Sequence, residues 1–98
     1  MKVRYTETAL VEIDEIFAYI AERNRNAATA VADRIKRTIT NLAEFPLMAQ
    51  AADEPGTRMM PVGRYPFLVF YTVNNDELVI LHVRHGARLR PWEHEHEP

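Results

Sequence analysis

Apolar residues in the first half of the chain recur three or four positions apart, in two successive stretches. In the first stretch, over residues 7–22, they are Ala9, Leu10, Ile13, Ile16, Phe17 and Ile20. In the second stretch they are Ala28, Val31, Ala32, Ile35, Ile39 and Leu42. This spacing places each set on one face of an α-helix. Because only a few polar residues separate the stretches, the pattern predicts an antiparallel helical hairpin.

The residues that flank these stretches indicate where each helix begins and ends. Thr6 or Thr8 is a suitable N-cap for the first helix, and Asn26 is suitable for the second. Pro46 predicts the end of the second helix, because proline disfavours the helical conformation in the residue before it. The carboxylates of the first helix, Glu12 among them, fall away from the apolar stripe, so we expect them to be solvated.

Outside the hairpin the pattern changes to short segments that favour β-strands. Residues 2–5 alternate between polar and apolar side chains, and residues 59–62, 67–73 and 78–84 are rich in apolar, β-branched or aromatic side chains. Residues 74–76, which are Asn and Asp, predict a hairpin turn because both types tolerate positive φ. The element order β-α-α-β-β-β predicts an α+β fold, in which the helical hairpin packs on a mainly antiparallel sheet.

Alternation within the last predicted strand indicates which of its side chains reach the core. Val79, Leu81 and Val83 would face the helices. His82 would lie on the other face of the sheet, together with Ile80 and Arg84. We therefore expect His82 to be a residue of the surface or of the sheet edge.

Composition narrows the class of protein. The 98 residues carry a formal net charge of −2 and include neither cysteine nor serine, which excludes disulfides and thiol or serine nucleophiles. The longest apolar run, residues 67–71, is far shorter than the ~20 residues of a membrane helix. The glycines are too far apart for a phosphate-binding loop. We expect a single cytoplasmic domain over residues 1–92, a frayed acidic tail over residues 93–98, and no cofactor.

Arginines are in excess in the later strands and in the segment that follows them. His85 lies between Arg84 and Gly86, and Arg88 follows closely. An imidazole among guanidinium groups suits acid–base chemistry or contact with phosphate. The alternative is a histidine that ends a strand in a polar loop. His94 and His96 could bind a metal ion, but the tail offers no third ligand, so we predict no metal site.

Short motifs follow one another over residues 1–90. They are Tyr5-Thr6-Glu7-Thr8-Ala9, Asp14-Glu15-Ile16, Ala18-Tyr19-Ile20-Ala21, Leu42-Ala43-Glu44-Phe45-Pro46, Pro61-Val62-Gly63-Arg64-Tyr65 and Phe70-Tyr71. The most distinctive motif lies between Ile80 and Arg88, and it contains V-x-H-G-A-R. In this order the motifs resemble those of ParE-type toxins of the RelE/ParE superfamily.

The resemblance implies the toxin of a type II toxin–antitoxin pair, neutralised by a cognate antitoxin that is ParD-like or of another kind. The ParE branch is associated with poisoning of DNA gyrase, and the RelE branch with cutting mRNA in the ribosome. A ribonuclease would use Arg64, Arg84, His85 and Arg88, but no lysine follows Lys36 and the C-terminal aromatic residue is tryptophan. This set is more similar to the ParE branch. We therefore expect gyrase inhibition by binding, with a ribonuclease or a non-toxic binding relative as alternatives.

Two groups of residues are candidates for contact with other proteins. Arg84, His85, Arg88 and Trp92 are the candidates for contact with the target. For the antitoxin, we expect an amphipathic helix across the hairpin and a strand along an exposed sheet edge. The hairpin residues assigned to this contact are Leu10, Ile13, Phe17, Val31 and Ile35. The alternative is that all five belong to the internal core.

Overall fold

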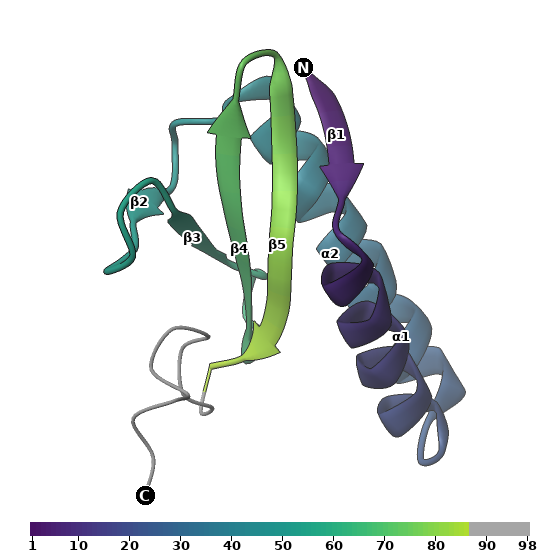
Figure 1. The fold of residues 1–98 in the computed structure, drawn as a ribbon. Helices are drawn as coiled ribbons and strands as arrows, with labels where there is room; N and C mark the ends of the chain where they lie inside the picture. Colours follow the sequence, from purple (N-terminus) through teal and green to yellow (C-terminus); the bar gives the residue numbers. More distant parts are fainter. Residues whose placement is uncertain (87–98) are drawn as a thin grey trace, which may run out of the picture.

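A helical hairpin covers one face of a five-stranded sheet in the computed structural model, which describes residues 1–86 (Figure 1). The elements are β1 (Lys2–Tyr5), α1 (Glu7–Ala21), α2 (Arg25–Glu44), β2 (Gln50–Ala51), β3 (Arg58–Pro61), β4 (Phe67–Asn74) and β5 (Glu77–His85). The predicted α+β fold and its element order are confirmed, with the two-residue strand β2 as an addition. The predicted domain boundary after residue 92 lies outside the described residues. Within residues 1–86, no helix is long and apolar enough to cross a membrane.

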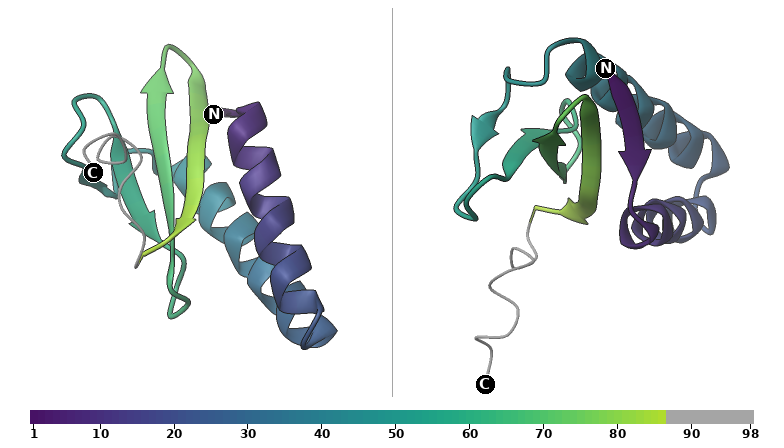
Figure 2. Two further views of the ribbon diagram at one scale, coloured as in Figure 1. Left: turned by 60° about the horizontal axis from the view of Figure 1, so that its bottom comes forward. Right: turned by 45° about the horizontal axis from the view of Figure 1, so that its top comes forward.

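The sheet joins the N-terminal strand to the last described strand. Its strand order is β1-β5-β4-β3-β2, and β1 pairs with β5 in parallel, from Lys2 opposite Glu77 to Tyr5 opposite Ile80. The other neighbouring pairs are antiparallel. Both views of Figure 2 show the two helices together on one side of this sheet. The pairing of β1 ends at Ile80, so the edge of β5 beyond that residue is left to α1.

Side chains of the preceding residues cap both helices. The Thr6 hydroxyl accepts a hydrogen bond from the Ala9 N–H at 3.1 Å, as predicted for an N-cap. Helix α2 begins earlier than predicted, because the side chain of Asn24 rather than that of Asn26 accepts from the Ala27 N–H at 3.0 Å. Helix α2 ends at Glu44, before Pro46, as expected.

We expect Thr6→Ala to lower the free energy of unfolding by about 1–2 kcal/mol. The substitution removes the cap of α1, and it also removes a hydroxyl that lies 2.9 Å from the Ile80 carbonyl oxygen on β5. Thr8→Ala, at an exposed position in the first turn of α1, is the control and should change stability by under ~0.5 kcal/mol. Urea unfolding of both variants checks this, and equal losses would contradict the cap assignment.

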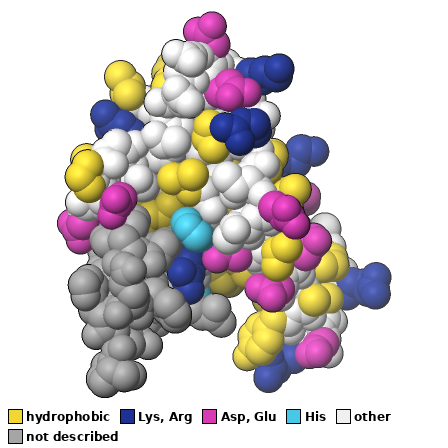
Figure 3. All heavy atoms as spheres, viewed as in Figure 1, with side chains coloured by type: hydrophobic (Ala, Val, Ile, Leu, Met, Phe, Trp, Pro, Cys, Tyr) yellow, Lys and Arg dark blue, Asp and Glu magenta, His cyan; other side chains and the backbone are white. Residues whose placement is uncertain are grey.

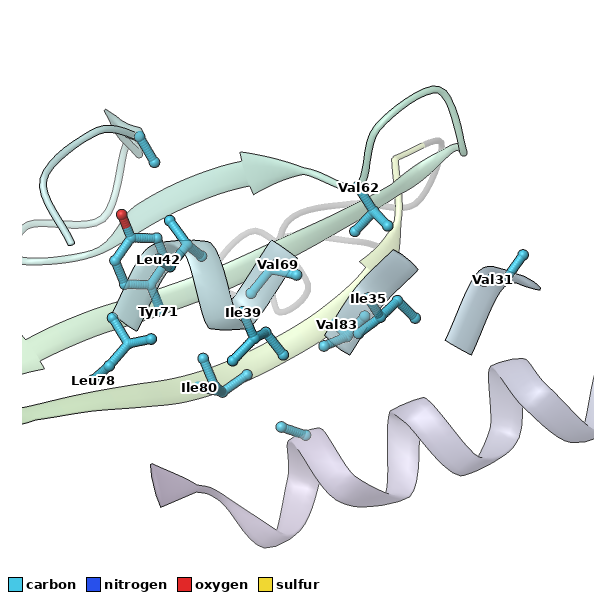
Figure 4. Packing of buried hydrophobic residues seen from close by; sticks show 12 residues of the cluster. Val31, Ile35, Ile39, Leu42, Val62, Val69, Tyr71, Leu78, Ile80 and Val83 are labelled. Atoms are coloured by element: carbon cyan, nitrogen blue, oxygen red, sulfur yellow. The ribbon is translucent and has the colours of Figure 1, made fainter. Parts of the chain in front are cut away.

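The core lies between α2 and the inner face of the sheet (Figure 4). Its largest members are Val31, Ile35, Ile39 and Leu42 on α2, with Val62, Val69, Tyr71, Leu78, Ile80 and Val83 from the sheet side. Tyr71 is fully buried, and its hydroxyl donates to the Pro46 carbonyl oxygen at 2.7 Å. Burial raises the pKa of Tyr71, against a smaller opposing effect of Arg58. The phenol therefore stays protonated and ties the segment that follows α2 to β4.

A β-bulge changes the alternation of β5. Tyr71 pairs with Ile80 and Phe70 pairs with His82, which leaves Leu81 without an opposite residue. Ile80 therefore belongs to the core together with Val83, three positions later. The predicted inward set of Val79, Leu81 and Val83 is correct only for Val83. Val79 is buried, but it lies outside the cluster between the helices and the sheet.

Candidate functional site

The carboxylate of Glu12 lies at the edge of β5, where β1 no longer pairs. Figure 1 shows α1 continuing from β1 alongside the second half of β5. The Val83 N–H donates to Glu12 Oε1 at 3.0 Å, so a helix side chain supplies the acceptor that a neighbouring strand would otherwise offer. The side chain of Glu12 is only 18% exposed. The prediction that Glu12 belongs to a solvated face is therefore wrong.

Two side chains of β5 converge on the same carboxylate. His82 Nδ1 lies 3.2 Å from Glu12 Oε1, and Arg84 Nε lies 3.7 Å from Glu12 Oε2. We call these three residues the Glu12 cluster. Arg84 Nε is buried and makes no hydrogen bond within residues 1–86, so the nearby negative charge is its compensation. His82 does lie near the sheet edge, as predicted, but its ring is held by a carboxylate.

A hollow of about 410 Å³ opens beside His82, on the sheet face away from the core. Its lining is formed by Thr6, Thr8, Glu54, Thr57, Phe70, Leu81 and His82. A hydrogen bond joins His82 Nδ1 to the carboxylate of Glu12, and this fixes the orientation of the imidazole ring at the hollow. Within residues 1–86, no group of three His, Asp or Glu side chains is placed to hold a metal ion. His94 and His96 lie outside the described residues.

The structure separates the residues predicted to contact the target. Arg84 is not part of an exposed basic surface, because its side chain is only 21% exposed and its guanidinium is directed to Glu12. His85 is exposed at the end of β5, and its ring packs edge-on against Phe67, with the ring centroids 5.6 Å apart. Arg88 and Trp92 lie outside the described residues. Of the predicted group, His85 is the member that the structure shows at the surface.

Arg64, the remaining residue of the candidate ribonuclease set, has different neighbours. It lies in the connection between β3 and β4 and lines a second hollow, together with Arg34 and Arg37 of α2. Arg84 does not line this hollow, and its guanidinium group faces the carboxylate of Glu12. Sequence reasoning missed both Glu12 and the α2 arginines as partners of the candidate residues.

The candidate antitoxin residues divide into an exposed and a buried group. Leu10 and Phe17 on α1 are 50% and 37% exposed, and Ile13 between them is half-buried. At the helical period these three share one flank of α1, and Glu12 lies on the other. Figure 3 shows apolar side chains gathered among acidic ones over α1. Val31 and Ile35, in contrast, are 5% and 3% exposed and belong to the core, so the free protein does not present them to a partner.

Comparisons with known proteins agree with this fold and these motifs. The family model of the ParE toxin of type II toxin–antitoxin systems matches residues 3–90. The chain is 32% identical over 90 residues to Y4kP of Sinorhizobium fredii, whose name describes it as a toxin candidate; the match covers 92% of this chain and 93% of that protein. It is 31% identical over 88 residues to toxin RelE2 of Caulobacter vibrioides, covering 90% and 98% of the two chains.

A solved structure has the same fold. It is that of a chromosomal ParDE toxin–antitoxin system from P. aeruginosa, and one of its chains aligns with a TM-score of 0.78 and 20% identity. The alignment covers 87% of this chain and 95% of that chain. The family match covers both helices and the sheet from residue 3 onward, and it includes all three residues of the Glu12 cluster. The chain therefore belongs to the ParE toxin family of type II toxin–antitoxin systems.

Proposed function

We propose that this protein inhibits DNA gyrase by binding to it. The observation that carries the proposal is the position of the Arg84 side chain, which is mostly buried and faces the carboxylate of Glu12. A ribonuclease of this superfamily needs cations that are free to stabilise a pentavalent phosphate, and Arg84 is already compensated. Membership of the ParE family supports the same choice. The contact surface would begin at His85 and include Arg88 and Trp92. Arg84 would not contact gyrase itself; it would position the end of β5 through its ion pair with Glu12.

Supercoiling by purified gyrase tests this proposal. We expect the protein to block supercoiling and its expression to induce DNA-damage signalling. His85→Ala and Arg88→Ala should each weaken inhibition by about tenfold, which is typical for a residue central to an interface. Arg25→Ala, at an exposed site on α2, should leave inhibition unchanged. Equal weakening by all three variants would contradict the contact surface.

A second candidate function is ribosome-dependent cleavage of mRNA. The observation that favours it is the 31% identity to a protein named toxin RelE2. Cleavage of mRNA on ribosomes, without an effect on gyrase, would establish this function in place of the first. If expression has no effect on growth and neither assay responds, the protein is a binding relative without toxicity. Both candidate targets are in the cytoplasm, and we place the protein there.

We also propose that a cognate antitoxin, ParD-like or of another kind, covers the exposed flank of α1. The support comes from Leu10, Ile13 and Phe17, which place apolar surface on one side of a helix. An amphipathic helix of the antitoxin would bury these side chains and remove their apolar surface from water. The outer edge of β1 would accept a strand of the antitoxin. Val31 and Ile35 are left out of this surface because they are buried.

A further inference from the structure

Three arginines meet in a hollow of about 340 Å³ between α2 and the connection from β3 to β4. Arg34 and Arg37 extend from α2, and Arg64 comes from the connection. The lining is completed by Ala30, Asp33 and Tyr65. We propose that this hollow is a binding site for a phosphate group. The site is separate from the Glu12 cluster, and the proposal does not depend on the identity of the toxin's target.

No salt bridge within residues 1–86 reaches the guanidinium groups of the hollow. The salt bridges of residues 1–86 join Arg4 to Glu77, and His82 and Arg84 to Glu12. None of them involves Arg34, Arg37 or Arg64. Asp33 is the one carboxylate in the lining, so the side chains of the hollow carry a formal net charge of +2. Like charges that are only partly compensated repel one another, and a bound anion would relieve this repulsion.

One of these guanidinium groups lies directly against the backbone of the connection. Gly63 has a φ of +57°, and a Cβ added there would lie 2.6 Å from Arg34 Nε and 3.0 Å from Arg34 Cζ. Glycine therefore serves two purposes at this position. It adopts a backbone conformation that other residues adopt at a cost, and it lets the guanidinium lie directly against the turn. Arg34 therefore lies against the turn that carries Arg64, the next residue along the connection, and both side chains line the same hollow.

The chemistry of the hollow favours phosphate over carboxylate. Each guanidinium presents parallel N–H donors that match two oxygens of one anion. A phosphate group has enough oxygens to accept from two or three arginines at once, whereas a carboxylate has only two. The charge of a phosphate dianion also matches the formal charge of the hollow. The phosphate could belong to a free nucleotide or polyphosphate, or to the backbone of a nucleic acid.

Titrations of the full-length protein at low salt test the site with three probes, which are pyrophosphate, a short DNA duplex and a poly-glutamate peptide. We expect pyrophosphate or DNA to bind and to shift the NMR signals of the Arg34 and Arg64 Nε–H groups. Arg34→Gln and Arg64→Gln should each weaken binding by about tenfold, as loss of a charge-assisted hydrogen bond would. Lys36→Gln is the matched control. It removes the same charge from an exposed position on α2 outside the lining, and should weaken binding by less than about twofold.

The outcomes separate the sources of the phosphate. If the protein binds pyrophosphate but not DNA, the ligand is a free phosphate compound. If it binds DNA, and if Arg34→Gln and Arg64→Gln weaken that binding, the ligand is the backbone of a nucleic acid. If Lys36→Gln weakens binding as much as the two arginine variants do, binding reflects non-specific electrostatic attraction to the whole protein, and the proposal is overturned. Binding of poly-glutamate alone would overturn it in favour of an acidic protein partner, and failure of all three probes to bind would refute it. Thermal unfolding of each variant confirms that it is folded.

Discussion

Replacing Glu12 with alanine should lower the free energy of unfolding by about 3 kcal/mol. The substitution leaves the Val83 N–H without its acceptor, and it removes the carboxylate that faces both His82 and Arg84. All three side chains of the Glu12 cluster are less than one-third exposed, so water replaces these interactions poorly. For a domain of this size, the loss corresponds to a decrease in the melting temperature of about 12 °C or more.

Two further variants separate the contributions of hydrogen bonding and charge at Glu12. Glu12→Gln keeps an oxygen for the Val83 N–H but loses the charge, so we expect about half of the loss. Glu15→Ala removes an exposed carboxylate from the same helix and should change stability by under ~0.5 kcal/mol. The measurement is urea or thermal unfolding of the purified proteins. A Glu12→Ala variant as stable as Glu15→Ala would show that the cluster does not stabilise the fold.

Local patterns were sufficient to predict the helices and the long strands. The three- and four-residue spacing defines α1 and α2, and Pro46 ends α2 as expected. Asn24 and Asn26 are equally suitable caps by residue type, so the sequence did not decide where α2 begins. Strand β2 has only two residues and depends on its pairing with β3. No pattern within two residues can reveal such a strand.

The interactions of β5 were harder to predict. Every residue from Leu78 to Leu81 is apolar, so the sequence offered no alternation from which to locate the bulge. Glu12 carried a usable signal, because it lies three residues after Ala9 and four before Ile16, on the side of the buried positions. The predicted apolar stripe included Leu10 and Phe17, which are exposed, and this turned the predicted buried face away from Glu12. The spacing was consistent with a carboxylate that reaches the sheet.

The arginine hollow depends on the tertiary fold. Arg34 and Arg37 fall on the polar side of α2 in the sequence pattern, and Arg64 lies far along the chain. Only the packing of α2 beside the connection between β3 and β4 brings them together. Charge counting along the sequence detected the excess of arginine in the later strands, but it assigned Arg64 to the same group as Arg84. The structure assigns these two arginines to different surroundings.

The largest effect on binding is expected on the exposed flank of α1. A double variant, Leu10→Ala with Phe17→Ala, should weaken binding of the cognate antitoxin by about a hundredfold, because buried apolar anchors dominate most protein interfaces. Leu10 and Phe17 are 50% and 37% exposed, so truncating them removes little from the core of the free protein. The matched control is Val11→Ala with Tyr19→Ala, which truncates side chains that are 50% and 62% exposed and lie outside that flank of α1. The control should bind the antitoxin as the wild type does.

Calorimetric titration with the antitoxin measures these affinities, and thermal unfolding provides an independent readout. An antitoxin that binds only the folded state adds about 4 kcal/mol of apparent stability at a free concentration a thousandfold above its dissociation constant. We expect this stabilisation for the wild type and the control, together with slower hydrogen exchange in α1. At the same antitoxin concentration the double variant should lose more than half of the stabilisation. Equal weakening by the control pair would place the antitoxin elsewhere on α1, and an unchanged melting temperature of the wild type at saturating antitoxin would refute the proposed surface.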